Sequence, residues 1–507
     1  MKINRFKITT SIAIVLCAIL IGITSNLSAP PNLLHQWRQC DGLSMSINYY
    51  EEGLDFFNPQ IHFQHSHDGR AVGEFPILYY SNAILWKCFG HSHLVSRLLN
   101  LSIFLIGLYF LSLTSFILTK DKFLSICVPL LVLSSPLIAR YAPAFLPNTT
   151  ALSFLFISIY YFAQHYEDKN RKALILCVVF AALSALLRTT MLIGFVPLIA
   201  IALVSKFDYK RLLVLASPLF AVLLWVLYIK SYNSEYGSVY FLTKITPVWE
   251  MSGEEISLVW DQINLRVKSN VMSSFLFVSL LIFAFYIIKS WRKIGNILLL
   301  YIGLVFLATV AYFILWFKKL GVHDYYFIEL FILVPSIVIL LGKLGLKRNH
   351  FTVIILAAAT VFSITVGAIR HRFIHSPSQH LNPIEQIVLK GSEVSYWNWF
   401  HDNYNQKFKA FESAQTFIRD LGIQREDLVF SIQDPSPNIT LYLLDVKGYT
   451  ALYQHNKSYD QQIESMKEKG VKYLITLDNS VLNEISEGFV GEHLGTYQNI
   501  DVFSLRN

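Results

Sequence analysis

The stretch HQWRQCDG, residues 35–42, follows on the first long apolar run of the chain, and the interpretation of the whole sequence depends on it. Arg38 and Asp41 are three positions apart, which places them on one face of a helix if the stretch is helical. A carboxylate at the end of a membrane span can have a tuned pKa and can take a proton from an attacking hydroxyl. Spacing alone favours a simpler interpretation, a solvated loop acid paired with Arg38, because exposed pairs at this spacing are common and contribute only about 0.2–0.5 kcal/mol.

The composition is that of a polytopic membrane protein. Of 507 residues, 54% are hydrophobic and only 15% are charged, a balance that ordinary soluble domains do not show. Apolar runs close to the ~20 residues that cross ~30 Å of hydrocarbon recur along the first three quarters. The net charge of +8 is scattered through short loops, which argues against a nucleic-acid partner. We predict eleven spans, at 8–27, 94–118, 123–139, 151–162, 173–187, 191–204, 212–228, 271–288, 297–317, 327–341 and 352–368.

The basic residues predict how these spans are oriented. If the amino terminus is cytoplasmic, the inner loops are KDK (120–122), DKNRK (168–172), KFDYKR (206–211), KSWRK (289–293) and KLGLKR (343–348). All are basic, as the positive-inside rule requires. This arrangement needs the apolar segment 173–204 to break into two spans around RTT at 188–190. The first span follows three basic residues, as a signal peptide does, but TSNLSAPPN is a poor cleavage site, so we expect the span to be retained.

Three long segments are then expected on the outer face, at 28–93, at 230–270 and after Arg370. Beyond Arg370 the hydropathy falls, and the helical patterns KFKAFESAQTFIRDLG and SYDQQIESMKEKG alternate with the strand patterns DLVFSIQ, VKYLITL and IDVFSLR. We therefore predict a membrane domain over 1–369, which includes the outer loop 28–93, and a soluble extracytoplasmic α/β domain over 370–507. The second domain has no glycine-rich phosphate loop and no Cys/His metal spacing.

Other polar residues stand next to predicted spans. Glu74, in GEFPILYY, precedes Pro76, where its simplest role is to cap the start of a helix, a position that the helix dipole favours for an acid. In RYAPAFLPNTT, Arg140 leaves the third span, and Asn148 is a plausible cap for the next helix. Asn148, Asn438 and Asn456 also match the weak N-x-Ser/Thr sequon, which we expect to be idle.

The stretch HDYYFIEL opens the tenth span from the outer side. His323, Asp324 and Tyr325 could simply be interfacial residues. With Lys318 and Lys319 beside them, however, the turn gathers up to three cations near headgroup depth. A lipid-linked phosphate would suit that setting.

Histidines and cysteines give weaker signals. His62, His65 and His67 lack a firm ligand spacing, so we expect solvated histidines and not a metal site. Cys40 and Cys88 fall in one outer loop and could form a disulfide, although free thiols are the default expectation.

Four motifs in this order resemble a known family: WRQCDGLSMSINYYEEGLDFFNPQI, then GEFPILYYSNAILWKCFG followed by RLLN, then RYAPAFLPN, and finally HDYYFI. They look like those of the bacterial GT-C glycosyltransferases that use polyprenyl-phosphate sugars, the group around glycosyltransferase family 39 and the aminoarabinose transferases. The resemblance covers roughly residues 1–370. It implies a polytopic helical GT-C fold with about eleven transmembrane helices.

The resemblance also implies roles for single residues. Asp41 matches the catalytic base, Arg38 the arginine of the WRQ motif and Glu74 the acid of the EFP motif, which makes Glu74 the second catalytic candidate. The residues expected to bind the donor phosphate are Arg38, Lys318, His323 and Tyr325. Those expected to line the remaining pocket are Asp324, Arg140 and Asn148. Relatives often have an acid where this chain has Asn148, so we expect no second carboxylate role there.

The implied reaction moves a sugar from a polyprenyl-phosphate donor to a hydroxyl of a lipid, glycan or protein acceptor, with inversion, on the extracytoplasmic face of a bacterial plasma membrane. The carboxylates could hold a divalent metal ion or act unaided; no cofactor is certain. Two alternatives stay open. A transporter or flippase would suit eleven spans, but the predicted spans carry almost no ionisable residue at mid-membrane. A surface-glycan ligase or polymerase would use the same lipid carriers, and the sequence barely separates it from the transferase.

Overall fold

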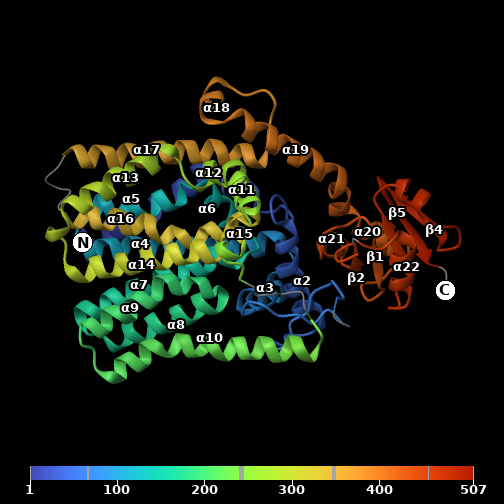
Figure 1. Cartoon of the computed structure of the whole chain (residues 1–507), viewed down its shortest axis with the longest axis horizontal. Helices are drawn as coiled ribbons and strands as arrows, with labels where there is room; N and C mark the ends of the chain where they lie inside the picture. The colour runs from blue at the N-terminus through green and yellow to red at the C-terminus, as the bar shows by residue number, and fades with distance from the viewer. Residues whose placement is uncertain (1, 66–67, 239–244, 345–349, 455, 506–507) are drawn as a thin grey trace. The chain divides into compact units, whose positions relative to one another are not determined.

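The computed structural model describes residues 2–65, 68–238, 245–344, 350–454 and 456–505 (Figure 1). The chain divides into two compact units. Unit 1 comprises Met1–Leu27, Ser96–Leu227 and Thr243–Ser395, and unit 2 comprises Ser28–Val95, Tyr228–Leu242 and Tyr396–Asn507.

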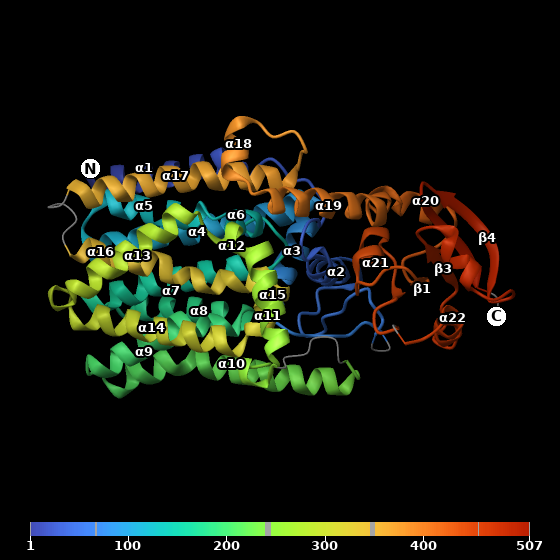
Figure 2. The same cartoon turned by 45° about the horizontal axis from the view of Figure 1, so that its top comes forward.

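Unit 1 is a bundle of helices, and Figures 1 and 2 show its long helices side by side with nearly parallel axes. Its elements are α1 (Lys2–Ile21), α4 (His93–Thr119), α5 (Lys122–Leu133), α6 (Pro136–Tyr141), α7 (Pro147–Asp168), α8 (Arg171–Leu187), η1 (Thr189–Met191), α9 (Leu192–Val204), α10 (Tyr209–Glu235), η2 (Val248–Glu250), α11 (Gly253–Gln262), η3 (Ile263–Val267), α12 (Lys268–Val271), α13 (Ser274–Lys289), η4 (Trp291–Lys293), α14 (Asn296–Leu315), α15 (Phe317–Val322), η5 (Asp324–Ile332), α16 (Leu333–Lys343), α17 (His350–His375), α18 (Pro383–Val388) and α19 (Gly391–Lys407), which continues into unit 2.

Each of the eleven predicted spans overlaps helical structure of this bundle, but 123–139 is divided between α5 and α6, and 327–341 between η5 and α16. Among the described residues, five helical segments are long and apolar enough to cross a membrane: α4, α10, α14, the continuous segment Asp324–Lys343 and α17. Three shorter apolar helices are Lys122–Leu133, Thr189–Val204 and Ser274–Lys289. The mostly helical, multi-pass character is therefore confirmed, whereas the count of eleven spans stays a prediction.

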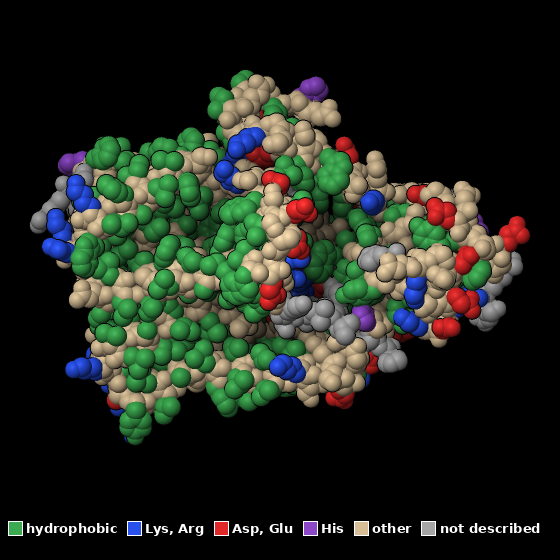
Figure 3. Space-filling model, in the orientation of Figure 1, with side chains coloured by type: hydrophobic (Ala, Val, Ile, Leu, Met, Phe, Trp, Pro, Cys, Tyr) green, Lys and Arg blue, Asp and Glu red, His purple; other side chains and the backbone are tan. Residues whose placement is uncertain are grey.

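The predicted break after α8 is present. Helix α8 ends at Leu187, a short 3₁₀ turn follows, and α9 begins at Leu192. Both α8 and α9 pack against α7, so the chain turns back at this point and does not continue as one long helix. The short connections α4–α5, α7–α8, α9–α10 and α13–α14 carry the predicted basic loops, and part of the fifth loop, at 345–348, lies outside the described residues. Figure 3 shows Lys and Arg side chains gathered at the end of the bundle where the amino terminus lies.

The outer surface of the bundle is apolar. Helix α10 presents Leu213, Phe220 and Leu227 outwards, and more than half of each of these side chains is exposed. Figure 3 shows hydrophobic side chains spread along the length of the bundle on the face turned to the viewer. Contiguous apolar surface of this extent is unstable in water and is typical of a face that contacts lipid.

Local chemistry sets the helix ends and one close helix contact. Helix α1 ends at Ile21, short of the predicted Leu27, because Gly22 adopts a φ of +93° and the Ile23 N–H bonds back to the Ala18 carbonyl at 3.1 Å. Gly367 of α17 lies against the backbone of Ser134, where an added Cβ would come within 2.1 Å of the Ser134 carbonyl oxygen. Small residues of this kind let membrane helices approach closely.

Unit 2 combines the first outer loop with the C-terminal residues. Its elements are α2 (Gln36–Glu52), α3 (Ile77–Phe89), η7 (Lys409–Ser413), α20 (Gln415–Asp420), β1 (Val429–Ser431), α21 (Ile439–Leu444), β2 (Gly448–Thr450), α22 (Tyr459–Lys467), β3 (Tyr473–Thr476), η8 (Asn479–Glu484), β4 (Val490–Tyr497) and β5 (Ile500–Leu505). The strands form one sheet in the order β2-β1-β3-β5-β4. Strand β1 is parallel to β2 and β3, and β5 is antiparallel to β3 and β4.

The predicted α/β pattern of the C-terminal residues is present. Strands β1, β3 and β5 and helix α22 lie in the stretches predicted for them, and their buried faces meet around Phe430, Ile463, Met466 and Leu474. The prediction of one helix over KFKAFESAQTFIRDLG is wrong: the stretch is divided into the end of α19, η7 and α20. At this bend Phe411 is fully buried.

The first outer loop pairs with the edge of this sheet. The Gln64 N–H donates to the Gly448 carbonyl at 2.8 Å, and the Gly448 N–H donates to the His62 carbonyl at 3.1 Å. The sequence assigned 28–93 to the membrane domain and set a boundary at Arg370. In the structure this loop belongs to unit 2 together with the C-terminal residues, and Arg370 lies inside α17.

Candidate functional site

Helix α2 is polar in sequence and yet almost entirely buried. Every residue from Gln39 to Tyr49 is buried, on all faces of the helix. Buried polar side chains are costly unless they are hydrogen-bonded, so a helix of this kind must be surrounded by polar partners. The residues discussed next are those partners.

Asp41 is fully buried on α2, next to Arg38. The two side chains form an ion pair, with 3.7 Å between Arg38 Nη1 and Asp41 Oδ2. The other terminal nitrogen of Arg38, Nη2, donates to Glu74 Oε1, and the Tyr79 hydroxyl donates to the same oxygen. One guanidinium therefore bridges two carboxylates, and we call Arg38, Asp41, Glu74 and Tyr79 the α2 cluster.

The α2 cluster corrects two interpretations drawn from spacing. The shared helix face of Arg38 and Asp41 is present, but Asp41 is neither in a loop nor solvated. Glu74 does not cap α3, because Pro76 is the N-cap residue and no side chain caps that helix end. The arginine that holds Glu74 lies 36 positions away in the sequence, so spacing within the EFP motif could not indicate it.

Asn438, from the C-terminal part of the chain, also lies next to Asp41. Its Nδ2 donates to Ser44 Oγ at 2.7 Å and lies 3.5 Å from both Asp41 Oδ1 and the Cys40 carbonyl oxygen. The sequence singled out Asn438 only as a sequon. A contact across 397 positions leaves no local signal in the sequence.

The protic groups around the α2 cluster are kept neutral. Burial, reinforced by the charge of Glu74, raises the pKa of the Tyr79 hydroxyl well above its usual value. Burial also raises the pKa of the Cys40 thiol well above its usual value, and the nearby carboxylates of Asp41 and Asp434 add to this. Both Cys40 and Cys88 are free thiols, and Cys88 is exposed.

A second group of buried charges lies in unit 1. Arg140, at the end of α6, donates to Asp324 Oδ2, and the Tyr141 hydroxyl donates to Asp324 Oδ1 at 2.6 Å. Both Arg140 and Asp324 are buried. The rings of His323 and Tyr325 lie close to each other, with centroids 5.4 Å apart. The structure thus brings together Arg140 with the predicted HDYY turn.

Asn148 has a different role from the predicted one. It does not cap α7, whose N-cap residue is Leu146, and its Nδ2 donates to Glu329 Oε1 at 3.1 Å. The same oxygen accepts bonds from Arg188 Nε at 3.1 Å, Arg188 Nη2 at 3.0 Å and Thr190 Oγ1 at 3.1 Å. Glu329 is fully buried and was missed, although a carboxylate inside an apolar run is a signal for such a site.

Lys318 forms an ion pair with Glu255 on α11. Its Nζ donates to Glu255 Oε1 at 2.8 Å, and both side chains are a little under half exposed. This hydrogen bond lowers the pKa of Glu255. The pair is a surface ion pair between α11 and α15.

A metal site is not evident in the part of the chain that the structure describes, where no three His, Cys, Asp or Glu side chains lie close enough to hold an ion. His62 bonds to Asp445 through Nε2 at 3.1 Å, and His65 packs edge-on against Tyr453. His67 lies outside the described residues.

Comparison with known proteins supports the predicted fold. No family model matches the chain, and no curated protein matches it significantly. The structure is similar to that of ArnT from Cupriavidus metallidurans in the apo state, with a TM-score of 0.55, 11% identity and 97% of each chain covered. For ArnT bound to undecaprenyl phosphate the TM-score is 0.56 and the identity 12%, again over 97% of each chain. The oligosaccharyltransferase of Archaeoglobus fulgidus, in complex with Zn and sulfate, gives a TM-score of 0.50 and 13% identity over 96% of this chain and 72% of that one. The resemblance noted in the sequence is thus confirmed at the level of the fold, which is that of the GT-C glycosyltransferases.

Proposed function

We propose that the chain is an integral-membrane glycosyltransferase that moves a sugar from a polyprenyl-phosphate donor to a hydroxyl of an acceptor. One observation carries the proposal: Asp41 is buried beside Arg38 on a polar helix that follows the first membrane helix. The fold supports it, because ArnT has the same fold and one of its structures holds undecaprenyl phosphate.

In the proposed reaction the acceptor hydroxyl oxygen attacks the anomeric carbon of the donor sugar. The new C–O bond forms as the bond between the anomeric carbon and the phosphate oxygen breaks, which inverts the configuration in one displacement. Asp41 accepts the hydroxyl proton, and polyprenyl phosphate leaves with the electron pair. Glu74 holds Arg38 next to Asp41 and is the second acid of the site.

The leaving phosphate gains negative charge in this step, so cations near it lower the barrier. Within unit 2, Arg38 is our candidate for this role, because the α2 cluster holds it beside Asp41. Within unit 1, the family resemblance proposes His323 and Tyr325, and the buried contacts of Arg140, Asp324 and Asn148 hold the HDYY turn in place. Lys318 is the least supported candidate, because it would first have to leave Glu255.

The burial of Asp41 sets a requirement on the mechanism. No part of this residue is exposed, so an acceptor can reach the carboxylate only after the covering side chains move. We propose that binding of the donor or acceptor opens this cover. The reaction is proposed to take place on the extracytoplasmic face of a bacterial plasma membrane, with a lipid, glycan or protein as acceptor.

The test uses purified full-length protein, a labelled polyprenyl-phosphate sugar and a membrane extract as the source of acceptor. We expect release of polyprenyl phosphate together with a labelled product. Asp41→Asn should abolish the release, because the amide cannot take the proton. Asp55→Asn is the matched control, since Asp55 belongs to the same loop but is exposed, and it should keep full activity. Normal turnover by Asp41→Asn refutes the assigned base.

A transporter is the second candidate, because Glu329 is an ionisable residue buried within the bundle and pairs with the partly buried Arg188; transport pathways often have such residues. Labelled lipid placed in proteoliposomes distinguishes the two. Movement of the intact lipid across the bilayer without release of polyprenyl phosphate would favour transport. A ligase or polymerase would release the carrier lipid only when the acceptor is itself a lipid-linked glycan.

A further inference from the structure

We infer that Asn438 is a positioning residue for Asp41, supplied by the C-terminal α/β part of unit 2. The inference rests on the proposed function and deepens it, because it makes the C-terminal residues a component of the catalytic site.

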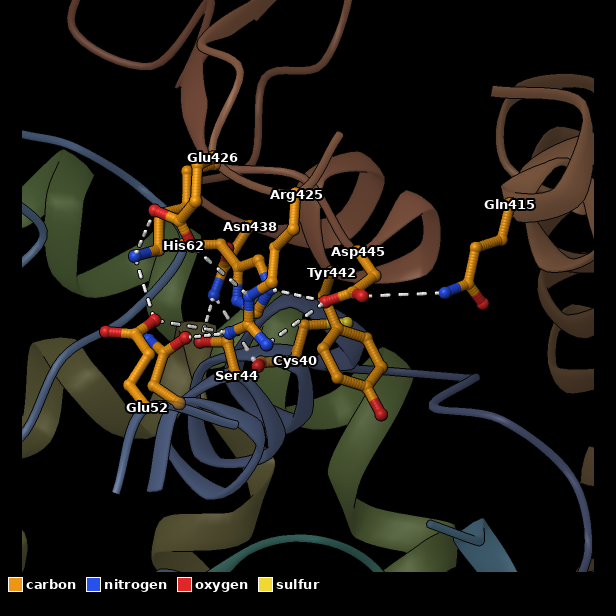
Figure 4. Close-up of polar contacts among 12 residues, drawn as sticks. Cys40, Ser44, Glu52, His62, Gln415, Arg425, Glu426, Asn438, Tyr442 and Asp445 are labelled. Carbon is orange, nitrogen blue, oxygen red and sulfur yellow. Dashed lines mark hydrogen bonds and ion pairs between the residues drawn. The ribbon is translucent and has the colours of Figure 1, made fainter. Parts of the chain in front are cut away.

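The side chain of Asn438 is aimed at α2. Asn438 is the N-cap residue of α21, where an asparagine side chain usually accepts bonds from its own helix, but no such cap bond is present. Instead Nδ2 donates to Ser44 and approaches Asp41 Oδ1 and the Cys40 carbonyl (Figure 4). A carboxylate and a carbonyl can only accept, so the amide must present its NH₂ group to them.

This orientation of the amide leaves the carbonyl oxygen of Asn438 without a hydrogen bond among the described residues. Asn438 is fully buried. A capping asparagine would avoid an unpaired buried carbonyl. The amide is therefore better explained by what its Nδ2 does for α2 than by stabilisation of α21.

Asn438 is held rigidly by the loop that precedes it. Asp434 Oδ1 accepts from the Ser436 N–H at 2.8 Å, and Oδ2 accepts from the N–H and hydroxyl of Thr440 at 3.0 and 2.7 Å. The Thr450 hydroxyl, on strand β2, donates to the Ser436 carbonyl at 2.6 Å. The amide of Asn438 is thus fixed to the sheet.

The sheet in turn is fixed to α2 at a second place. Arg425 donates to Asn48 Oδ1 and pairs with Glu52 at 3.5 Å, and Lys447 pairs with Glu52 at 2.8 Å. Figure 4 shows the guanidinium of Arg425 between Glu52 and Asp445. Two polar contacts about two turns apart on α2 therefore set both the position and the rotation of the helix that carries Asp41.

The physical effect concerns the charge and direction of the Asp41 carboxylate. A donor at Oδ1 stabilises the ionised form and directs that oxygen, which keeps the base competent at lower pH. The other charged or titratable groups around Asp41 are Arg38 and Cys40 on α2, Glu74 and Tyr79 at α3, and Asp434 and Tyr453 in the C-terminal part.

The test is the pH profile of polyprenyl-phosphate release for Asn438→Asp and Asn438→Ser. Asn438→Ser replaces the amide NH₂ group by a hydroxyl on a shorter side chain, and we expect the acid limb of kcat/KM to move up by about one pH unit. Asn438→Asp adds a like charge as well, and we expect a larger upward shift. If Asn438→Asp does not fold, Asn438→Ser decides the question alone.

Asn48→Asp is the matched control. It makes the same chemical change on a residue that the C-terminal part also contacts, but at Arg425, about 10 Å along α2 from Asp41. We expect its acid limb to stay in place. Lower rates without any shift in the Asn438 variants overturn the inference, and so does an equal shift in Asn48→Asp. A wild-type protein that releases no polyprenyl phosphate refutes the proposed function itself, which is a distinguishable result.

Discussion

Glu329→Ala should destabilise unit 1 far more than the loss of one surface ion pair. Glu329 Oε1 is fully buried and receives hydrogen bonds from Arg188, Thr190 and Asn148, which come from α7 and from the turn between α8 and α9. Removing the carboxylate takes away the counter-charge of Arg188, whose side chain is only 16% exposed. Breaking a buried pair from one side costs about 3–5 kcal/mol, and the partial exposure of Arg188 places our expectation near 3 kcal/mol.

The matched control is Glu255→Ala. It removes the partner of Lys318, in a pair whose side chains are 42% and 45% exposed. Surface pairs of this kind contribute little to stability, because water and salt screen the two charges. The two variants delete the same side chain from the same unit, so their difference reports burial and not residue type.

The assay is reversible unfolding in mixed micelles by titration with a denaturing detergent, followed by tryptophan fluorescence. A double variant, Glu329→Ala with Arg188→Ala, should recover part of the loss, because it no longer leaves a buried cation uncompensated. Equal destabilisation by Glu329→Ala and Glu255→Ala would contradict this reasoning. No recovery in the double variant would show that the cost comes from packing.

Two further predictions concern packing and pH. Gly367→Ala should lower the free energy of unfolding by about 1–3 kcal/mol in the same assay, because the new Cβ collides with the Ser134 carbonyl. The control is Gly303→Ala on α14, where nothing lies within 4 Å, and it should be neutral or slightly stabilising. Equal effects of the two substitutions would exclude the close contact at Gly367. Burial lowers the pKa of His62 from its usual 6.5, against the opposing effect of its bond to Asp445. The stability linked to His62 is therefore complete above pH 6.5 and is lost as the pH falls from 6.5 towards the folded-state pKa. His62→Gln should flatten this part of the dependence of unfolding free energy on pH, and parallel wild-type and variant curves would contradict the assignment.

Much of unit 1 could be predicted from the sequence because its determinants are local. The length of the apolar runs predicts the helices, and the alternation of basic loops predicts the break near Arg188. Helix ends were harder, since the end of α1 depends on the left-handed conformation of Gly22 and not on hydropathy.

The candidate site could be predicted only in part. The pairing of Arg38 with Asp41 follows from helical spacing, but the burial of Asp41 depends on residues from distant parts of the chain. Helix α2 is polar, and composition alone predicts an exposed helix. Glu329 and Asn438 bond to groups that no local pattern connects to them, so they become visible only in three dimensions.

The pairing of the first outer loop with strand β2 has a consequence for biosynthesis. His62 and Gln64 of the loop leave the ribosome about 385 residues before their partner Gly448 on β2. At the usual ~5–20 residues per second, helix α2 and its buried polar residues wait roughly 20–80 s for the chain that encloses them. During that interval the newly made loop is open to proteases and to trapping by chaperones, so truncation of the last hundred residues should expose the beginning of the protein to degradation.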